Sequence, residues 1–156
     1  MLTQKQIEQL IPLACKWAEE RERIILEKGV PLNEVELNDA RKIGVLHPEK
    51  VRLLCVDKIP VPQDPALNSA TKQINFLTDS TIGLCLRYGI IIQSARWRNR
   101  SIIVHELTHT MQYERLRGFE QFLKQYLHEC ITVGYLFSPL EQEAVSFQRK
   151  ICNGNY

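Results

Sequence analysis

The sequence lacks a long apolar run, a signal-peptide pattern and a strong net charge. No apolar run approaches the length needed to cross a bilayer, and residues 1–13 carry Gln, Lys and Glu where a secretory signal peptide would be continuously apolar. The formal net charge is only +2, too small for a field that attracts phosphate groups. We therefore expect a cytoplasmic protein with no nucleic-acid partner and no membrane partner.

The cysteines lack any pairing pattern. They are odd in number, widely scattered, and contain no Cys-x-x-Cys pair, so we expect reduced thiols rather than disulfides or a thiolate zinc site. The five positions are Cys15, Cys55, Cys85, Cys130 and Cys152.

The composition is that of an ordinary globular protein. Of 156 residues, 44% are hydrophobic and 24% charged, and no linker, internal repeat or low-complexity segment divides the chain. We predict a single domain that spans residues 1–156.

Hydrophobic periodicity and helix-cap signals predict helices on both sides of a small central sheet. The first helix starts after Thr3, which forms a capping-box pattern with Gln6, and ends at Gly29. Further helices are expected at about 33–43, 66–76, 101–116, 119–132 and 139–151, and β-structure at 51–59 and 81–93. The charge run at 19–23 predicts a solvated surface. The predicted class is α+β, with a hairpin at 81–93 just before the helix that starts near residue 101.

The strongest chemical signal is His-Glu-Leu-Thr-His at residues 105–109, inside a predicted helix. Histidines four residues apart lie on one helix face, so both imidazoles can bind one metal ion. Glu106 lies between His105 and His109 and is placed as a general base. Apolar residues at 103, 104, 107 and 111 fall on the opposite side, which leaves one face for the core and one for a cleft.

Two histidines do not complete a zinc site, because catalytic zinc usually has three protein ligands and an open fourth position. A third histidine of the metzincin type is excluded, since Arg115 stands at the position of that histidine and Gln112 at the position of the glycine before it. The downstream candidates are His128, Glu129, Glu141 and Glu143. Of these, His128 is more typical of a partly buried structural histidine than of a ligand, because its neighbours are apolar.

The region from about Ile90 to Phe147 resembles the zincin metallopeptidases, and among them the gluzincins, whose third ligand is a glutamate on a later helix. It is most similar to the heat-shock and prenyl-protein-processing metalloproteases, which carry a Glu-x-x-Ala-Asp motif. Glu141-Gln142-Glu143-Ala144-Val145 aligns with that motif, so the resemblance implies Glu141 as third ligand and a zincin-like fold with an edge hairpin against the active-site helix. Helical placement alone leaves Glu143 as an alternative.

Three weaker signals accompany the motif. Tyr135, or else Tyr113, is a candidate donor to a developing oxyanion, with loop or core packing as the alternative. The run Ile90–Ile92 is either an edge strand that pairs with substrate or an ordinary core strand. The basic segment at 96–100 is too short to indicate nucleic acid; it is either a solvated loop or a partner for acidic side chains.

The sequence therefore predicts a zinc metallopeptidase. Zn²⁺ is held by His105, His109 and Glu141, Glu106 and Tyr135 assist catalysis, and the substrate is a peptide or protein. The main alternative is a catalytically inactive binding or regulatory module, because Val145 replaces the Asp with which the family supports a motif histidine. A second alternative is a scaffold that binds a partner helix through the first helix.

Overall fold

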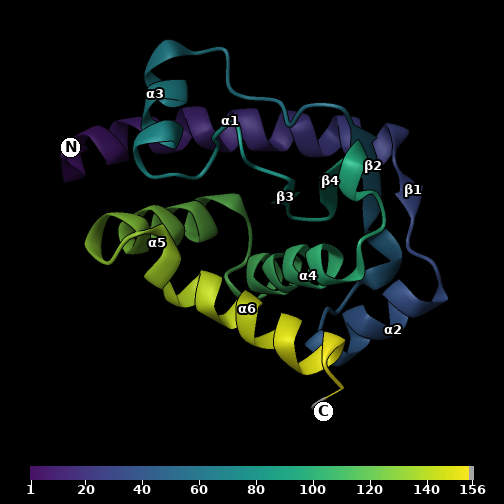
Figure 1. Cartoon of the computed structure of the whole chain (residues 1–156). Coiled ribbons are helices and arrows are strands. Elements are labelled where there is room, and N and C mark those ends of the chain that lie inside the picture. The colour runs from purple at the N-terminus through teal and green to yellow at the C-terminus, as the bar shows by residue number, and fades with distance from the viewer. Residues whose placement is uncertain (155–156) are drawn as a thin grey trace.

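The computed structural model describes residues 1–154, which form an α+β fold of six α-helices and a mixed four-stranded sheet (Figure 1). The helices are α1 (Gln4–Lys28), α2 (Glu34–Ile43), α3 (Pro65–Gln73), α4 (Arg100–Arg115), α5 (Phe119–Thr132) and α6 (Pro139–Cys152). The strands are β1 (Val30–Pro31), β2 (Arg52–Val56), β3 (Gly83–Leu86) and β4 (Gly89–Gln93). Short 3-10 helices lie at Pro48–Lys50, Ser94–Arg96 and Tyr135–Phe137.

The helix limits follow local capping chemistry. Thr3 and Gln6 form the predicted capping box at the start of α1, and Gly29 ends that helix. Asn33 and Glu36 form a second capping box at the start of α2, which ends at Gly44 in the left-handed conformation. The predicted helices are therefore confirmed to within a few residues.

The sheet order is β1-β2-β4-β3. β3 and β4 form the predicted antiparallel hairpin, whereas β2 and β4 pair in parallel across a long connection. The residues Ile90–Ile92 are at most 2% exposed and lie in the central strand β4. The edge-strand interpretation of this run is therefore wrong, and the core-strand interpretation is right: the edge of the sheet beside α4 is β3.

The sheet lies between two helical layers, with α1 along one face and α4 along the other (Figure 1). The packing of α1 on β4 is close, because a Cβ at Gly89 would meet Ile25 at 3.0 Å. Glu22 of α1 is buried and binds Arg87 in the β3–β4 turn through two contacts of 2.8 and 2.6 Å. The charge run at 19–23 is thus not wholly solvated; Glu22 joins α1 to the hairpin.

The basic segment at 96–100 contacts acidic side chains of α2. Arg98 pairs with Glu36, and Arg100 pairs with Asp39 through two contacts of 2.9 Å. Both carboxylates are buried, so these ion pairs fix the start of α4 relative to α2. Within residues 1–154, no helix combines the length and the apolar character needed to cross a membrane.

Candidate metal centre

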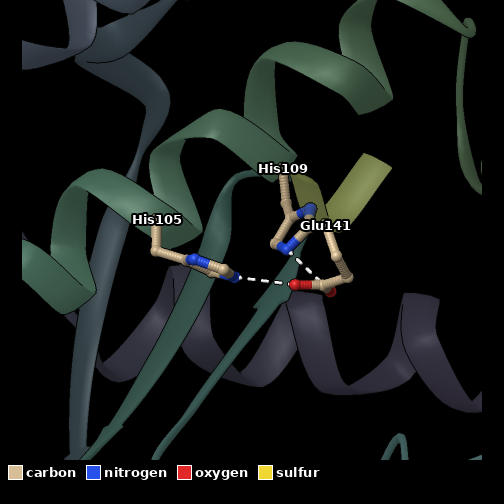
Figure 2. Close-up of side chains that lie close together, drawn as sticks. All are labelled: His105, His109 and Glu141. Carbon is tan, nitrogen blue, oxygen red and sulfur yellow. Dashed lines mark hydrogen bonds and ion pairs between the residues drawn. The ribbon is translucent and has the colours of Figure 1, made fainter. Parts of the chain in front are cut away.

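The predicted metal ligands come together where α6 packs against α4. His105 and His109 lie one turn apart on α4, and Glu141 lies in the first turn of α6. His105 Nε2 is 3.0 Å from Glu141 Oε2, and His109 Nε2 is 3.2 Å from Glu141 Oε1. Figure 2 shows both imidazoles directed at the same carboxylate.

This group has the donor types of a zinc site, and its ligand atoms lie near one another. One ligand atom from each residue lies within 4.8 Å of the others. A tetrahedral zinc ion with bonds of about 2.1 Å separates its ligand atoms by about 3.4 Å, so only small side-chain shifts are needed to admit the ion. Two imidazoles and one carboxylate leave the fourth position open.

Each histidine is oriented by an amide side chain through its other ring nitrogen. His105 Nδ1 lies 2.8 Å from Gln148 Oε1, and His109 Nδ1 lies 2.8 Å from Gln112 Oε1. An amide oxygen accepts a hydrogen bond from Nδ1–H, so Nε2, which faces Glu141 in both rings, is the nitrogen that each histidine presents to a metal. Gln148 lies two turns beyond Glu141 on α6 and orients His105.

The ligand carboxylate is also held in place. The Tyr126 hydroxyl of α5 donates to Glu141 Oε1 at 2.6 Å, and this tyrosine is 2% exposed. The start of α6 is fixed by Glu129, whose Oε2 accepts from the Ser138 hydroxyl at 2.7 Å and from the Leu140 amide at 3.1 Å. Glu129, a candidate ligand from the sequence, therefore has a capping role.

The ionisation of these groups reflects their mutual contact. Burial by itself would lower the pKa of His105, but the hydrogen bond with Glu141 and the charges of Glu106 and Glu141 outweigh burial and raise it to about 9. Burial would raise the pKa of Glu141, but its contacts with His105 and His109 hold that pKa well below its usual range. Because the raised pKa keeps a proton on His105 at neutral pH, a metal ion has to displace this proton when it binds.

Glu106 of α4 is buried against the edge strand β3. Burial raises the pKa of this carboxyl group, while His105 and His109 oppose the shift. The strand approaches closely, because a Cβ on Gly83 would lie 3.0 Å from Glu106 Oε1. Glu106 is not one of the three grouped side chains, but it lines the same cavity as they do.

A polar cavity connects Glu106 with the three candidate ligands. It offers about 160 Å³ to water-sized molecules, more than the roughly 10–15 Å³ that one water molecule requires. Tyr135 lines this cavity together with His105, His109, Glu106 and Glu141. Burial and the charge of Glu141 raise the pKa of Tyr135, so its hydroxyl keeps the proton that a hydrogen-bond donor needs.

Three other sequence candidates lie away from the ligand group. Tyr113 is fully buried and stacks on Phe122 with 3.7 Å between ring centroids, so it is a core residue. His128 is exposed and lines a groove between α1 and α5, so the expected partial burial of this histidine is wrong. Glu143 accepts from Gln112 at 2.8 Å and pairs with Arg115 at 2.9 Å, so it supports the residue that orients His109.

Comparison with models of protein families, with curated proteins and with solved structures finds no match for this chain. The assignment of function therefore depends on the geometry and chemistry of the site itself.

Loss of the Tyr126 hydroxyl is expected to weaken metal binding. Tyr126→Phe removes the hydrogen bond that orients Glu141 but keeps the aromatic ring, which packs on Phe122 and Phe76. We expect zinc affinity to fall by about 10–100-fold, the usual effect of removing a group that orients a ligand. Competition with a fluorescent chelator measures the affinity. Tyr88→Phe, which removes a hydroxyl bonded to Glu114 instead, is the matched control, and an equal loss in both variants contradicts the assignment.

A methyl group at Gly83 is expected to displace Glu106. The added Cβ would approach Glu106 Oε1 at 3.0 Å and Ile102 Cγ2 at 3.1 Å, so the carboxylate has to move. We expect Gly83→Ala to lower kcat by at least about tenfold while bound zinc is retained, because a displaced general base transfers protons poorly. Turnover and zinc content are measured on the same sample, which separates displacement of Glu106 from loss of metal. Unchanged turnover contradicts the claim that Gly83 leaves the space in which Glu106 acts.

Proposed function

We propose that this protein is a zinc-dependent hydrolase, and specifically a peptidase, with its metal held by His105, His109 and Glu141. The observation that carries the proposal is the convergence of these three side chains within 4.8 Å, in one cavity with the buried carboxylate of Glu106. A metal site alone would not require Glu106, because this residue is not among the ligands. Its presence in the cavity favours chemistry over a purely structural metal.

When bound, zinc would supply Lewis acidity, which lowers the pKa of water to near neutral and polarises a carbonyl group. The residues of the chain supply the proton transfers. Glu106 accepts a proton as water attacks the scissile carbonyl and then delivers it to the leaving amine. Its raised pKa brings it closer to the working pH, which helps both transfers.

Tyr135 is the candidate for stabilising negative charge on the carbonyl oxygen. It lies in the short helix just before α6 and lines the same cavity as Glu106. Its hydroxyl is protonated and uncharged, as an oxyanion donor must be. The same proposal includes a zincin-like fold. It also includes a cytoplasmic location, which the five unpaired cysteines favour.

The alternative is a binding or regulatory module that holds a metal without turnover. Its support is Val145, which stands where the resembling metalloproteases have Asp. The contact of Gln148 with His105 weakens this argument, because another side chain performs the orienting role.

The proposal is tested by incubating the zinc-loaded protein with a mixed peptide library at neutral pH and identifying products by mass spectrometry. We expect cleavage that stops when a chelator removes the metal and returns when zinc is added back. Metal binding without any cleavage favours the inactive module.

A further inference from the structure

A surface groove leads from the cavity that contains Glu106 and the candidate ligands along the turn before α6. It is lined on one side by Val133, Leu136 and Phe137 and on the other by Asn75, Thr78 and Ser80. The groove is continuous with the cavity, because Asn75, Thr78, Ser80 and Tyr135 line both.

The apolar side of the groove is exposed and yet fixed in place. Val133, Leu136 and Phe137 are 47%, 69% and 72% exposed. The turn that carries them is closed by backbone hydrogen bonds from Phe137 to Gly134 and from Ser138 to Tyr135, and Gln142 of α6 donates to the Leu136 carbonyl. The backbone of the turn is thus pre-organised, although its large apolar side chains have no place in the core.

The opposite side of the groove is polar but uncharged. Its amide and hydroxyl groups suit the backbone of an extended peptide, and no charged side chain within residues 1–154 lines the groove. A charged side chain of a substrate would lose hydration here without gaining a partner. A large apolar side chain would bury its surface against the turn.

We propose that the groove selects peptides with a large, uncharged apolar side chain close to the scissile bond, which contacts Val133, Leu136 and Phe137. This inference rests on the proposed function for the position of the scissile bond. It names the substrate class as flexible peptide segments that present residues such as leucine or phenylalanine.

The test measures peptide binding separately from cleavage. Zinc-loaded Glu106→Gln is titrated into fluorescein-labelled Ala-Ala-X-Ala-Ala peptides with X as Leu, Phe, Ser, Asp or Lys, and anisotropy reports binding. We expect the Leu and Phe peptides to bind at least about tenfold more tightly than the others. The two substitutions Leu136→Ser and Phe137→Ser, made together in the Glu106→Gln variant, should abolish this preference. Leu46→Ser, at a site that is 73% exposed and lines neither the cavity nor the groove, should leave the preference unchanged.

Each outcome decides the inference. Equal binding of all five peptides, no binding, or a preference that survives the double change overturns it. Apolar preference in binding, together with no cleavage by the parent protein, supports the groove and rejects the peptidase. Cleavage by the parent protein without apolar preference in binding supports the peptidase and rejects the groove. If the double change instead removes binding to phosphatidylcholine vesicles, or dissociates an oligomer in sedimentation, the apolar turn serves a membrane or a second copy, and the inference is overturned.

Discussion

Replacing Glu106 with glutamine is expected to lower peptide hydrolysis by about two to four orders of magnitude while zinc content and folding stay unchanged. Glutamine has nearly the same size, and its side-chain oxygen can still accept the backbone hydrogen bond from Cys85. It cannot take a proton from water at neutral pH. Rates at saturating substrate for the parent protein and for Glu106→Gln, with equal zinc occupancy, measure the effect.

The control for this change is Glu120→Gln, which neutralises an exposed carboxylate paired with Lys124 on α5. It should cleave at the parent rate, because Glu120 does not line the cavity. If Glu106→Gln cleaves as fast as the parent, then Glu106 is not the base, whatever the metal content.

The second large effect concerns the two glutamates of α6. Glu141→Ala removes a proposed ligand, so zinc affinity should fall by more than the roughly 10–100-fold typical of residues that only orient ligands. Glu143→Ala should reduce affinity by less than about tenfold, because Gln112 keeps its second contact with the Leu140 carbonyl at 2.9 Å. Zinc titrations of both variants measure the difference.

The two variants differ by two positions on one helix, so each is a control for the other. Circular dichroism checks that both fold. If Glu143→Ala releases zinc and Glu141→Ala retains it, the assignment of the third ligand is wrong.

The elements with strong local signals could be predicted from the sequence. The capping box of Thr3 and Gln6, the left-handed Gly44 and the hairpin turn at Arg87-Tyr88 act within a few residues, so local chemistry determines them. The two histidines on one face of α4 follow from helical periodicity alone.

What the sequence could not predict depends on contacts between distant segments. The parallel pairing of β2 with β4 places Ile90–Ile92 in the centre of the sheet, and no local pattern distinguishes this from an edge. The burial of Glu22 depends on Arg87, 65 residues away. Tyr126 resembles an ordinary core aromatic until α5 and α6 pack together.

Two further site residues left a signal that spacing arguments can detect. Gln112 follows His109 by three positions, and Gln148 follows Glu141 by seven, so each shares a helix face with a proposed ligand. A search for amide or carboxylate side chains at these offsets would have found both.

The central claim is that His105, His109 and Glu141 form a zinc site, and the metal content of the purified chain tests it most directly. The protein is stripped with chelator, reconstituted with zinc, desalted and measured by elemental analysis against protein concentration. The three-ligand site predicts one zinc ion per chain, and the absence of bound zinc after reconstitution of folded protein contradicts it.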